Sequence, residues 1–484
     1  MPISALPSKY GIGTLGSEAY AFVDFLKSCK QVYWQILPIG PTGFGDSPYQ
    51  SFSAYAGNPY WIDLDMLADE GLLTHNEIKR SGLRDNPDFI DYGNLYEKRY
   101  RLLSKAAMRI PPEDEGFASF CEENSEWLYD YTLFMALKLK NGMSSFQDWP
   151  QRYRVYNEKK LAKVSEELKD KIHVRKVFQY LFFKQWTNFK NYANENGVKI
   201  IGDIPIYVSP DSSDLWANHR LFQVNGEKEM TKIAGCPPDY FNATGQRWGN
   251  PLYNWNYHKR QGYDWWVKRL RHAGKIFDTV RIDHFRGFSG YYAIPSENET
   301  AEFGEWKKGP GKTLIASFKE KVPELDIIAE DLGYLTPDVR RLLKYSGYPG
   351  MKVLQFAFDA SEDSDYLPHK YDSNSVVYTG THDNTTLHDW VKTASPVEIK
   401  VAKKYLKVRR KPDLEEAIIG AAMNSKSDIC IIPIQDWLGL GKKARINTPG
   451  TDEGNWRFRV RKEALSKEAV EKIREATESS GRAR

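Results

Sequence analysis

The segment FDTVRIDHFRG (277–287) is a short apolar run that ends in a group of charged and polar side chains. Two other segments have the same form, LDIIAEDLG (325–333) and SVVYTGTHDN (375–384). Each run predicts a buried strand. The carboxylates that follow the strand ends are Asp283, Glu330 and Asp383. Because the carboxyl ends of parallel strands meet on one face of a closed barrel, we expect these three side chains to converge.

Four more apolar runs predict strands, and helical patterns lie between them. The runs are YWQIL (33–37), KIIGDI (199–204), KVLQFAF (352–358) and ICIIPI (429–434), and a very short strand near residues 1–4 would be the eighth. The helical patterns include SEAYAFVDFLKSCKQ (17–31), DWWVKRLRHAGKIF (264–277), TPDVRRLLKYS (336–346) and SPVEIKVAKKYL (395–406). Strands that alternate with helices pair in parallel through right-handed crossovers. The sequence therefore predicts an α/β protein with a (β/α)8 TIM barrel.

An open, doubly wound sheet is the alternative architecture. It is disfavoured because no GxGxxG motif joins a strand to a helix, and because the charged strand ends are spread over four strands rather than one switch point. A TIM barrel with insertions can exceed 400 residues, so we treat residues 1–484 as one catalytic barrel domain.

Two gaps between the expected strands are too long for single crossovers. Residues 60–185 are helical in pattern and charged, which predicts a helical insertion subdomain. Residues 205–262 are rich in Gly, Pro, Asn and aromatic residues with little periodicity, and we interpret them as a loop-rich lid insertion. The aromatic content of this second insertion argues against disorder.

The composition excludes several classes of protein. Among 484 residues, 27% are charged with a net charge of +4, which gives no electrostatic signature for nucleic acid or membrane binding. No run approaches 18 apolar residues, and residues 1–30 lack a signal-peptide pattern. Four widely spaced cysteines without a CxxC pair fit the reducing cytoplasm. Aromatic residues make up 14%, enough both to fill a core and to offer stacking surfaces for sugar rings.

The first two motifs suit cleavage of a glycosidic bond, which uses two carboxyl groups. Arg281 precedes Asp283 by two residues on the same face of a strand, where its charge would lower the pKa of Asp283 and keep this carboxylate ionised as a nucleophile. Glu330, close to another carboxylate and shielded from water, would have a raised pKa and suit a general acid. A structural ion pair is the alternative interpretation of the first motif, and a helix N-cap suits Asp331.

The third motif and several single residues allow other interpretations. Asp383 could hold sugar hydroxyls while His382 hydrogen-bonds the sugar, although His–Asp neighbours are common by chance. Asp203 follows another strand and could hold substrate or cap the next segment. Zinc binding by His284 and His382 is disfavoured because no HxH or HExxH spacing exists. A Schiff-base role of Lys352 is disfavoured because no phosphate-binding glycine loop follows the last strands.

These segments carry a family resemblance over nearly the whole chain, from SALPSKYGIGTLG (4–16) to NTPGTDEGNWRFR (447–459). The most specific segments are LPIGPTGFGDSPYQSFSAYAGNPYWIDLD (37–65), GCPPDYFNATGQRWGNPLYNW (235–255), VRIDHFRGF and YTGTHDNTT. The chain resembles the amylomaltases, or 4-alpha-glucanotransferases (disproportionating enzymes), of glycoside hydrolase family 77 in the alpha-amylase clan. The resemblance implies a barrel without a separate C-terminal β-domain. Family members usually have a longer first strand, so the first strand of this barrel is expected to be short.

The resemblance also implies roles for individual residues. Asp283 matches the nucleophile, Glu330 the acid/base and Asp383 the aspartate that stabilises the transition state. The substrate contacts that it implies are Ser47, Tyr49, Asp203, Trp248, Arg281, His284, His382 and Asn447. No metal and no organic cofactor are implied. Tyr96 and Tyr100 in the helical insertion could contact a second glucan, but packing is the simpler interpretation.

The expected activity is transfer of α-1,4-glucan segments by double displacement, with maltooligosaccharides as donors and a glucan or glucose as acceptor. Segment 235–255 is expected to cover the site and exclude water. The alternatives are an amylase-type α-1,4-glucan hydrolase and a catalytically inactive glucan-binding barrel. The sequence leaves the oligomeric state open between monomer and homodimer.

Overall fold

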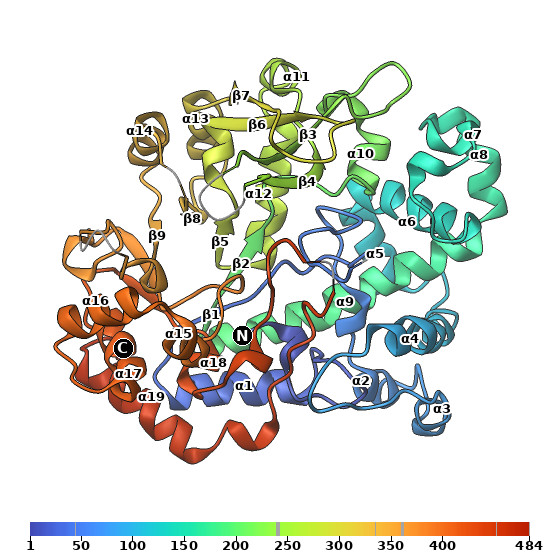
Figure 1. Ribbon diagram of the computed structural model, residues 1–484. Helices are drawn as coiled ribbons and strands as arrows, with labels where there is room; N and C mark the ends of the chain where they lie inside the picture. The colour runs from blue at the N-terminus through green and yellow to red at the C-terminus, as the bar shows by residue number, and fades with distance from the viewer. Residues whose placement is uncertain (44, 239–242, 334, 360–362, 452, 484) are drawn as a thin grey trace.

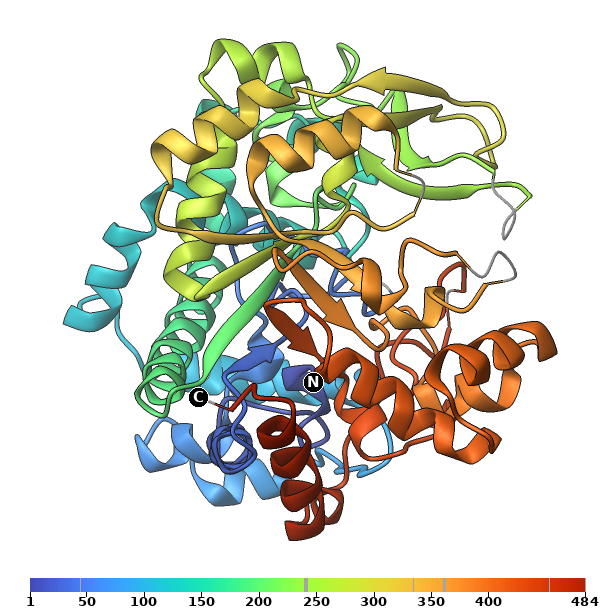
Figure 2. The same ribbon diagram turned by 90° about the vertical axis from the view of Figure 1, so that its left-hand side faces the viewer.

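A strand forms at each of the seven runs expected inside the chain in the computed structural model, which describes residues 1–43, 45–238, 243–333, 335–359, 363–451 and 453–483. The expected run 352–358 contributes only its first two residues, because the strand there covers Gly350–Val353 and Leu354–Phe356 form a 3₁₀ helix. The strands pair in parallel in the order β1 (Tyr33–Gln35), β2 (Lys199–Ile204), β5 (Thr279–Ile282), β8 (Asp326–Ala329), β9 (Gly350–Val353), β10 (Ser375–Tyr378) and β11 (Ile429–Ile431). The sheet curls into a nearly closed barrel with helices around it (Figure 1; Figure 2). This is the (β/α)8 architecture expected from the sequence, except that a 3₁₀ helix stands where the strand near residues 1–4 was expected.

Local sequence signals set the ends of the surrounding helices. The outer helices are α1 (Ser17–Ser28), α12 (Asp264–Ile276), α13 (Lys312–Lys321), α14 (Pro337–Ser346), α15 (Leu387–Thr393), α16 (Pro396–Leu406), α17 (Leu414–Met423), α18 (Ile434–Trp437) and α19 (Lys467–Ser479). Helix α14 begins with Pro337 at its first position and ends before Gly347, whose φ of 73° only glycine adopts readily. Helix α16 begins with a capping box in which Ser395 and Glu398 each accept a backbone N–H of the other residue. No β-domain follows α19 in the part of the chain that the structure describes.

The expected eighth strand near residues 1–4 is wrong. Residues Ile3–Ala5 form a 3₁₀ helix instead. The start of the chain lies beside β1, because the Met1 amine donates to the Gln35 carbonyl at 3.3 Å and the Trp34 indole donates to the Met1 carbonyl at 2.7 Å. Pro2 has no N–H to extend a ladder, which favours a turn over a strand at this point.

The range 60–185 contains the helices that its pattern indicates. They are α2 (Leu64–Asp69), α3 (His75–Arg80), α4 (Tyr92–Ala107), α5 (Glu115–Glu123), α6 (Ser125–Lys140), α7 (Gln151–Arg154), α8 (Glu158–Glu167) and α9 (Lys169–Glu195). Helix α9 crosses residue 185 without a break and packs on α4, α5 and α6 as well as on α1 and β2 of the barrel. The division of the chain into a barrel and a helical subdomain stays a prediction.

The range 205–262 has more regular structure than its composition indicates. It contains α10 (Ser213–Ala217), β3 (Lys232–Cys236), β4 (Gln246–Pro251) and α11 (Trp255–Arg260). Strand β3 pairs with β4 and with β6 (Gly290–Pro295), and β6 pairs with β7 (Glu305–Lys308), which makes a four-stranded antiparallel sheet. The strands that complete this sheet lie downstream, so local periodicity could not show it. Residues 239–242, within the expected lid, lie outside the described residues.

Aromatic side chains join helix α9 to the barrel. Phe189 near the end of α9 is fully buried, and its ring lies 5.8 Å from Tyr20, 5.6 Å from Trp34 and 5.8 Å from Trp186 (centroid to centroid). Edge-to-face packing of this kind adds to the gain from burial. Within the described residues, no helix is both long enough and apolar enough to cross a membrane.

We expect Phe189→Ala to lower the free energy of unfolding by about 3–5 kcal/mol, because it opens a cavity between α1, α9 and β1. Denaturant unfolding followed by circular dichroism measures the change. Met108→Ala at the end of α4 is the control, since this side chain is 78% exposed and its loss should cost almost nothing. Equal stability of the two variants would contradict the packing described.

Candidate active site

A buried arginine joins the carboxylates at the carboxyl ends of the strands. Arg281 on β5 has a side chain that is 4% exposed. Its Nη1 donates to Asp203 at 2.6 Å and contacts Asp283 at 3.4 Å, and its Nη2 donates to Glu330 at 3.1 Å. The strand register explains this grouping, because Asp203, Arg281 and Ile328 are Cα partners and Asp283 and Glu330 follow Arg281 and Ile328 by two residues. Residues two apart on a strand share one face.

Glu330 and its neighbour Asp331 point in different directions, as strand alternation requires. Asp331 does not cap a helix, contrary to the sequence-based interpretation, because Thr336 occupies the N-cap of α14. Instead the Asp331 carboxylate accepts the backbone N–H of Met351 at 2.7 Å. It continues the ladder between β8 and β9, which pair directly at Ala329 and Gly350.

His284 supplies a backbone donor to the centre. Its φ of 50° lies in the left-handed region, which costs a non-glycine residue about 1–2 kcal/mol. This conformation directs the His284 N–H at Glu330 Oε2, at 2.8 Å. The imidazole packs edge-on against the Trp248 ring of β4, with centroids 4.7 Å apart. Two residues expected to contact the substrate, His284 and Trp248, are thus adjacent, and Trp248 belongs to the antiparallel sheet.

The two carboxyl groups beside Arg281 titrate as a pair. Burial, the negative charge of Glu330 and a hydrogen bond with Glu330 raise the pKa of Asp283 well above its ordinary value. Burial also opposes ionisation of Glu330. However, the Arg281 charge and the donors around Glu330, the His284 N–H among them, bring the pKa of Glu330 below its ordinary value. Asp283 therefore holds a proton more readily than Glu330 does.

This proton distribution corrects the sequence-based expectation, in which Asp283 has the lowered pKa and Glu330 the raised one. The reason is the orientation of Arg281. Its shortest contacts go to Asp203 and Glu330, whereas the contact with Asp283 is 3.4 Å long. Glu330 also accepts the backbone N–H of His284. A carboxylate with two close donors is the better-stabilised anion.

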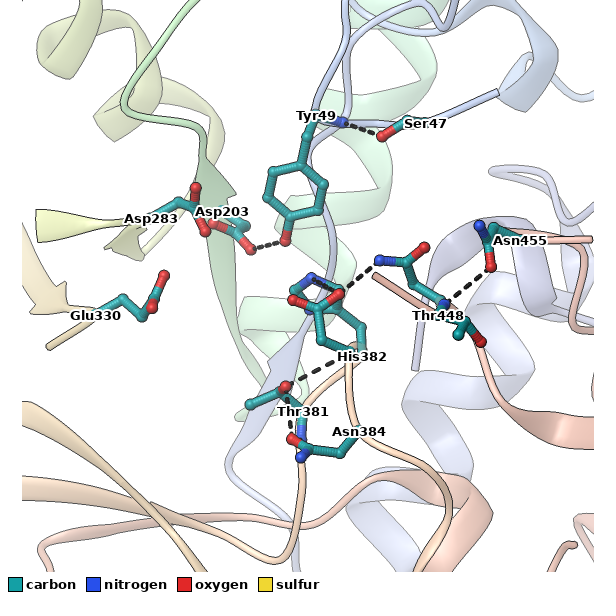
Figure 3. A network of polar contacts seen from close by, with 12 residues as sticks. Ser47, Tyr49, Asp203, Asp283, Glu330, Thr381, His382, Asn384, Thr448 and Asn455 are labelled. Carbon is teal, nitrogen blue, oxygen red and sulfur yellow. Dashed lines mark hydrogen bonds and ion pairs between the residues drawn. The ribbon is translucent and has the colours of Figure 1, made fainter. Parts of the chain in front are cut away.

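Tyr49 connects the side chains around Arg281 with His382 of the segment YTGTHDNTT. Its hydroxyl donates to Asp203 Oδ2 at 2.7 Å, and its ring stacks on the His382 imidazole at a centroid distance of 5.1 Å. Figure 3 shows the Tyr49 hydroxyl directed at Asp203 and the Tyr49 ring next to His382, with Asp283 and Glu330 on the side of Asp203 away from His382. The Tyr49 backbone N–H contacts Ser47 Oγ at 3.3 Å, so Ser47 shapes the turn that carries Tyr49. Asp203 is 2% exposed and lies beneath Tyr49 and Arg281.

Asp383 lies one side chain further along this series of contacts. Its carboxylate accepts the Asn447 side-chain amide at 2.6 Å and lies 3.4 Å from His382 Nε2. The side chain of Asp383 is 46% exposed, compared with 25% for Asp283 and 15% for Glu330. Within the described residues, no hydrogen bond or ion pair joins Asp383 directly to Asp283 or Glu330.

Three side chains of the site were not singled out from the sequence. Arg445 donates to the backbone carbonyls of Asp383 and Asn447 at 2.6 and 2.7 Å. The Trp456 ring lies 5.8 Å from His382 and 5.9 Å from Tyr49. Met351 offers its sulfur to Arg281 Nε at 3.4 Å. Trp456 lies within the segment 447–459, whose resemblance to the family could have indicated a role for it. Met351 belongs to no segment that carries the resemblance.

The geometry defines a class of enzyme. Two carboxyl groups lie at strand ends, bind one guanidinium and are partly open to solvent. Enzymes use such a pair of carboxyl groups to cleave glycosidic bonds. Among the described residues, no three His, Cys, Asp or Glu side chains gather in a way that could hold a metal ion. The barrel and the site together therefore indicate a glycoside-cleaving or glycosyl-transferring enzyme of the TIM-barrel type.

Comparison with known proteins identifies the family. The sequence model described as 4-alpha-glucanotransferase, glycoside hydrolase family 77, matches residues 1–465. The 4-alpha-glucanotransferase of Clostridium butyricum is 45% identical over 100% of both chains, and that of Thermus thermophilus is 43% identical over 99% of this chain and 97% of its own. The chain belongs to the 4-alpha-glucanotransferase family and is an enzyme of glucan transfer.

Solved structures agree with this assignment. Amylomaltase from Streptococcus agalactiae, solved in complex with acarbose, superposes with a TM-score of 0.97 at 40% identity and covers 100% of this chain and 99% of its own. Amylomaltase from Corynebacterium glutamicum, at 17% identity, shares the fold with a TM-score of 0.81 over 98% of this chain and 74% of its own.

We expect Tyr49→Phe to lower the free energy of unfolding by about 1–3 kcal/mol. The variant removes one of the two donors to Asp203 Oδ2, and Asp203 Oδ1 already has no hydrogen-bond partner among the described residues. Chemical denaturation of the two proteins measures the loss. Tyr129→Phe is the matched control, because its hydroxyl meets Ser165 in a partly exposed position. Unchanged stability of Tyr49→Phe would show that the buried hydrogen bond is not formed.

Proposed function

We propose that the enzyme cleaves an α-1,4-glucan donor with retention of configuration and passes the glycosyl segment to the 4-hydroxyl of another glucan or of glucose. Asp283 is the nucleophile, Glu330 the general acid and base, and Asp383 the carboxylate that holds sugar hydroxyls in the transition state. The observation that carries the proposal is the binding of Asp283 and Glu330 to one guanidinium, at 3.4 and 3.1 Å. This closeness favours a retaining enzyme, whose carboxyl groups are about 5–5.5 Å apart, over an inverting one.

Bond cleavage requires the proton on Glu330 rather than on Asp283. Attack on C1 needs an ionised Asp283, and departure of the 4-oxygen needs a protonated Glu330. A glucan that enters between the two carboxyl groups separates them, and its glycosidic oxygen accepts a hydrogen bond that only protonated Glu330 can donate. Arg281 remains beside Asp283 and stabilises its negative charge. Substrate binding thus favours protonation of Glu330 over that of Asp283.

In the first half-reaction, Asp283 forms a bond to C1 while the C1–O4 bond breaks and Glu330 protonates the departing 4-oxygen. In the second, ionised Glu330 takes the proton of the acceptor 4-hydroxyl, whose oxygen attacks C1 and releases Asp283. Tyr49, His382 and Trp248 offer ring faces and polar atoms around the sugar, and Asn447 holds Asp383. Asp203 serves in our proposal by fixing Arg281 and Tyr49, while direct contact with the sugar stays a prediction from the family.

Transfer rather than hydrolysis requires that a sugar, not water, reaches the glycosyl-enzyme. The segment 235–255 bears Trp248 on β4, next to His284, and is suited to cover the acceptor side of the site. We propose that it excludes water in this way. The cytoplasm is the proposed location, in keeping with four cysteines that form no disulfide with one another.

We expect Asp283→Asn to lower the rate of maltotriose disproportionation by several orders of magnitude, since the amide is not nucleophilic enough to form the glycosyl-enzyme. Chromatography of the products over time measures the rate. Asp326→Asn, at the exposed start of β8 and the opposite end of the barrel, is the control and should keep full activity. A nearly active Asp283→Asn enzyme would overturn the assignment.

The same assay on the unmodified enzyme separates the two reaction types. A transferase converts maltotriose into glucose and a ladder of longer maltodextrins while the number of reducing ends stays constant. A hydrolase yields maltose and glucose with a rising number of reducing ends, and that outcome would contradict the proposed transfer.

A further inference from the structure

The Nε–H of Arg281 has an acceptor that belongs to none of the carboxylates. Met351 on β9 is 1% exposed, and its thioether sulfur lies 3.4 Å from Arg281 Nε. A thioether is a weak acceptor, but distances of this length are typical of hydrogen bonds to sulfur. The other guanidinium nitrogens serve the carboxylates, Nη1 those of Asp203 and Asp283 and Nη2 that of Glu330. All three nitrogens of the group are therefore engaged.

The position of Met351 is held by the same strand that carries Glu330. The Asp331 carboxylate accepts the Met351 backbone N–H at 2.7 Å. Gly350 leaves room for this contact, because a Cβ there would lie 2.8 Å from both Asp331 carboxylate oxygens. The residue after the proposed acid/base thus fixes the backbone of the residue that touches Arg281.

The guanidinium is planar and rigid, so the direction of its Nε–H sets the directions of its four other N–H groups. Arg281 and Met351 also line one cavity beneath the site, which continues toward Gln35 and Tyr378. An acceptor for Nε–H adds to the contacts with the carboxylates in opposing rotation of the guanidinium.

We propose that Met351 is a positioning residue for the transfer reaction: its sulfur accepts the Nε–H of Arg281 and fixes the guanidinium plane that holds Asp283 and Glu330. The inference rests on the proposed function, since it concerns the carboxyl groups to which that proposal assigns the chemistry. Met351 itself does not contact the sugar. Its effect is on the geometry of the groups that do.

Met351→Leu tests this role, because leucine keeps the volume and the apolar character but has no acceptor. We expect kcat on maltotriose to fall about 10- to 100-fold with little change in KM. The acid limb of the kcat profile should move to higher pH, because a mobile Arg281 stabilises the ionised carboxyl groups less. Met135→Leu, a buried methionine of α6 that is 3% exposed, is the control and should match the unmodified enzyme.

A second variant and a melting curve separate positioning from packing. Met351→Gln replaces the sulfur by an amide that can accept the Nε–H, and it should regain part of the kcat lost in Met351→Leu. The melting temperature of Met351→Leu should equal that of Met135→Leu within a few degrees. Unchanged kcat and an unchanged pH profile in Met351→Leu would overturn the inference, and so would a loss of kcat that follows a large fall in melting temperature.

The failure of this inference differs from a failure of the proposed function. If Asp283→Asn is inactive while Met351→Leu behaves like the unmodified enzyme, only the role of Met351 is wrong. If Asp283→Asn retains activity, the assignment of the nucleophile is wrong, whatever Met351→Leu shows.

Discussion

The site depends on one buried cation and the three carboxylates that contact it. Burial of an arginine is costly unless opposite charges and hydrogen bonds compensate for lost hydration. Asp203, Asp283 and Glu330 supply that compensation to Arg281 at 2.6, 3.4 and 3.1 Å. The balance is mutual, because without Arg281 the same carboxylates would repel one another at close range. The positive charge of Arg281 thus compensates for the burial of these carboxylates, and it also holds the reacting groups Asp283 and Glu330 close together.

The barrel provides the cluster through simple strand geometry. Asp203 and Arg281 are partners in neighbouring strands, and Asp283 and Glu330 lie one step further along the same face. Neighbouring residues adjust the geometry of these side chains. His284, for example, adopts a left-handed backbone conformation that directs its N–H at Glu330. The reacting carboxylates thus lie directly after the ends of rigid strands, which keep geometry better than loops do.

A second layer of contacts connects the barrel to the C-terminal segment. Asn447 donates to the His382 carbonyl through its backbone N–H and to the Asp383 carboxylate through its side chain, at 3.1 and 2.6 Å. Arg445 binds the backbone carbonyls of Asp383 and Asn447. Asp383 is more exposed than Asp283 or Glu330, so these contacts are what orient it.

The sequence predicted the seven barrel strands and the convergence of Asp283 and Glu330, because parallel pairing determines where strand ends meet. It did not predict the proton distribution of the pair, which depends on a difference of a few tenths of an ångström between the contacts of Arg281. The antiparallel sheet from β3 to β7 was missed because β3 pairs with β6 across a long stretch of chain, which includes α11, α12 and β5. Met351 was missed because an apolar residue inside a strand normally signals packing.

The most direct test of this account is infrared difference spectroscopy of the resting enzyme as a function of pH, with Asp283 and Glu330 distinguished by their amide variants. The protonated carboxyl signal of Asp283 should persist to a higher pH than that of Glu330, disappear in Asp283→Asn and survive in Asp326→Asn. Ionisation of Asp283 at a lower pH than Glu330 would contradict the account, because it would show that burial and the charge of Glu330 do not raise the pKa of Asp283 above that of Glu330.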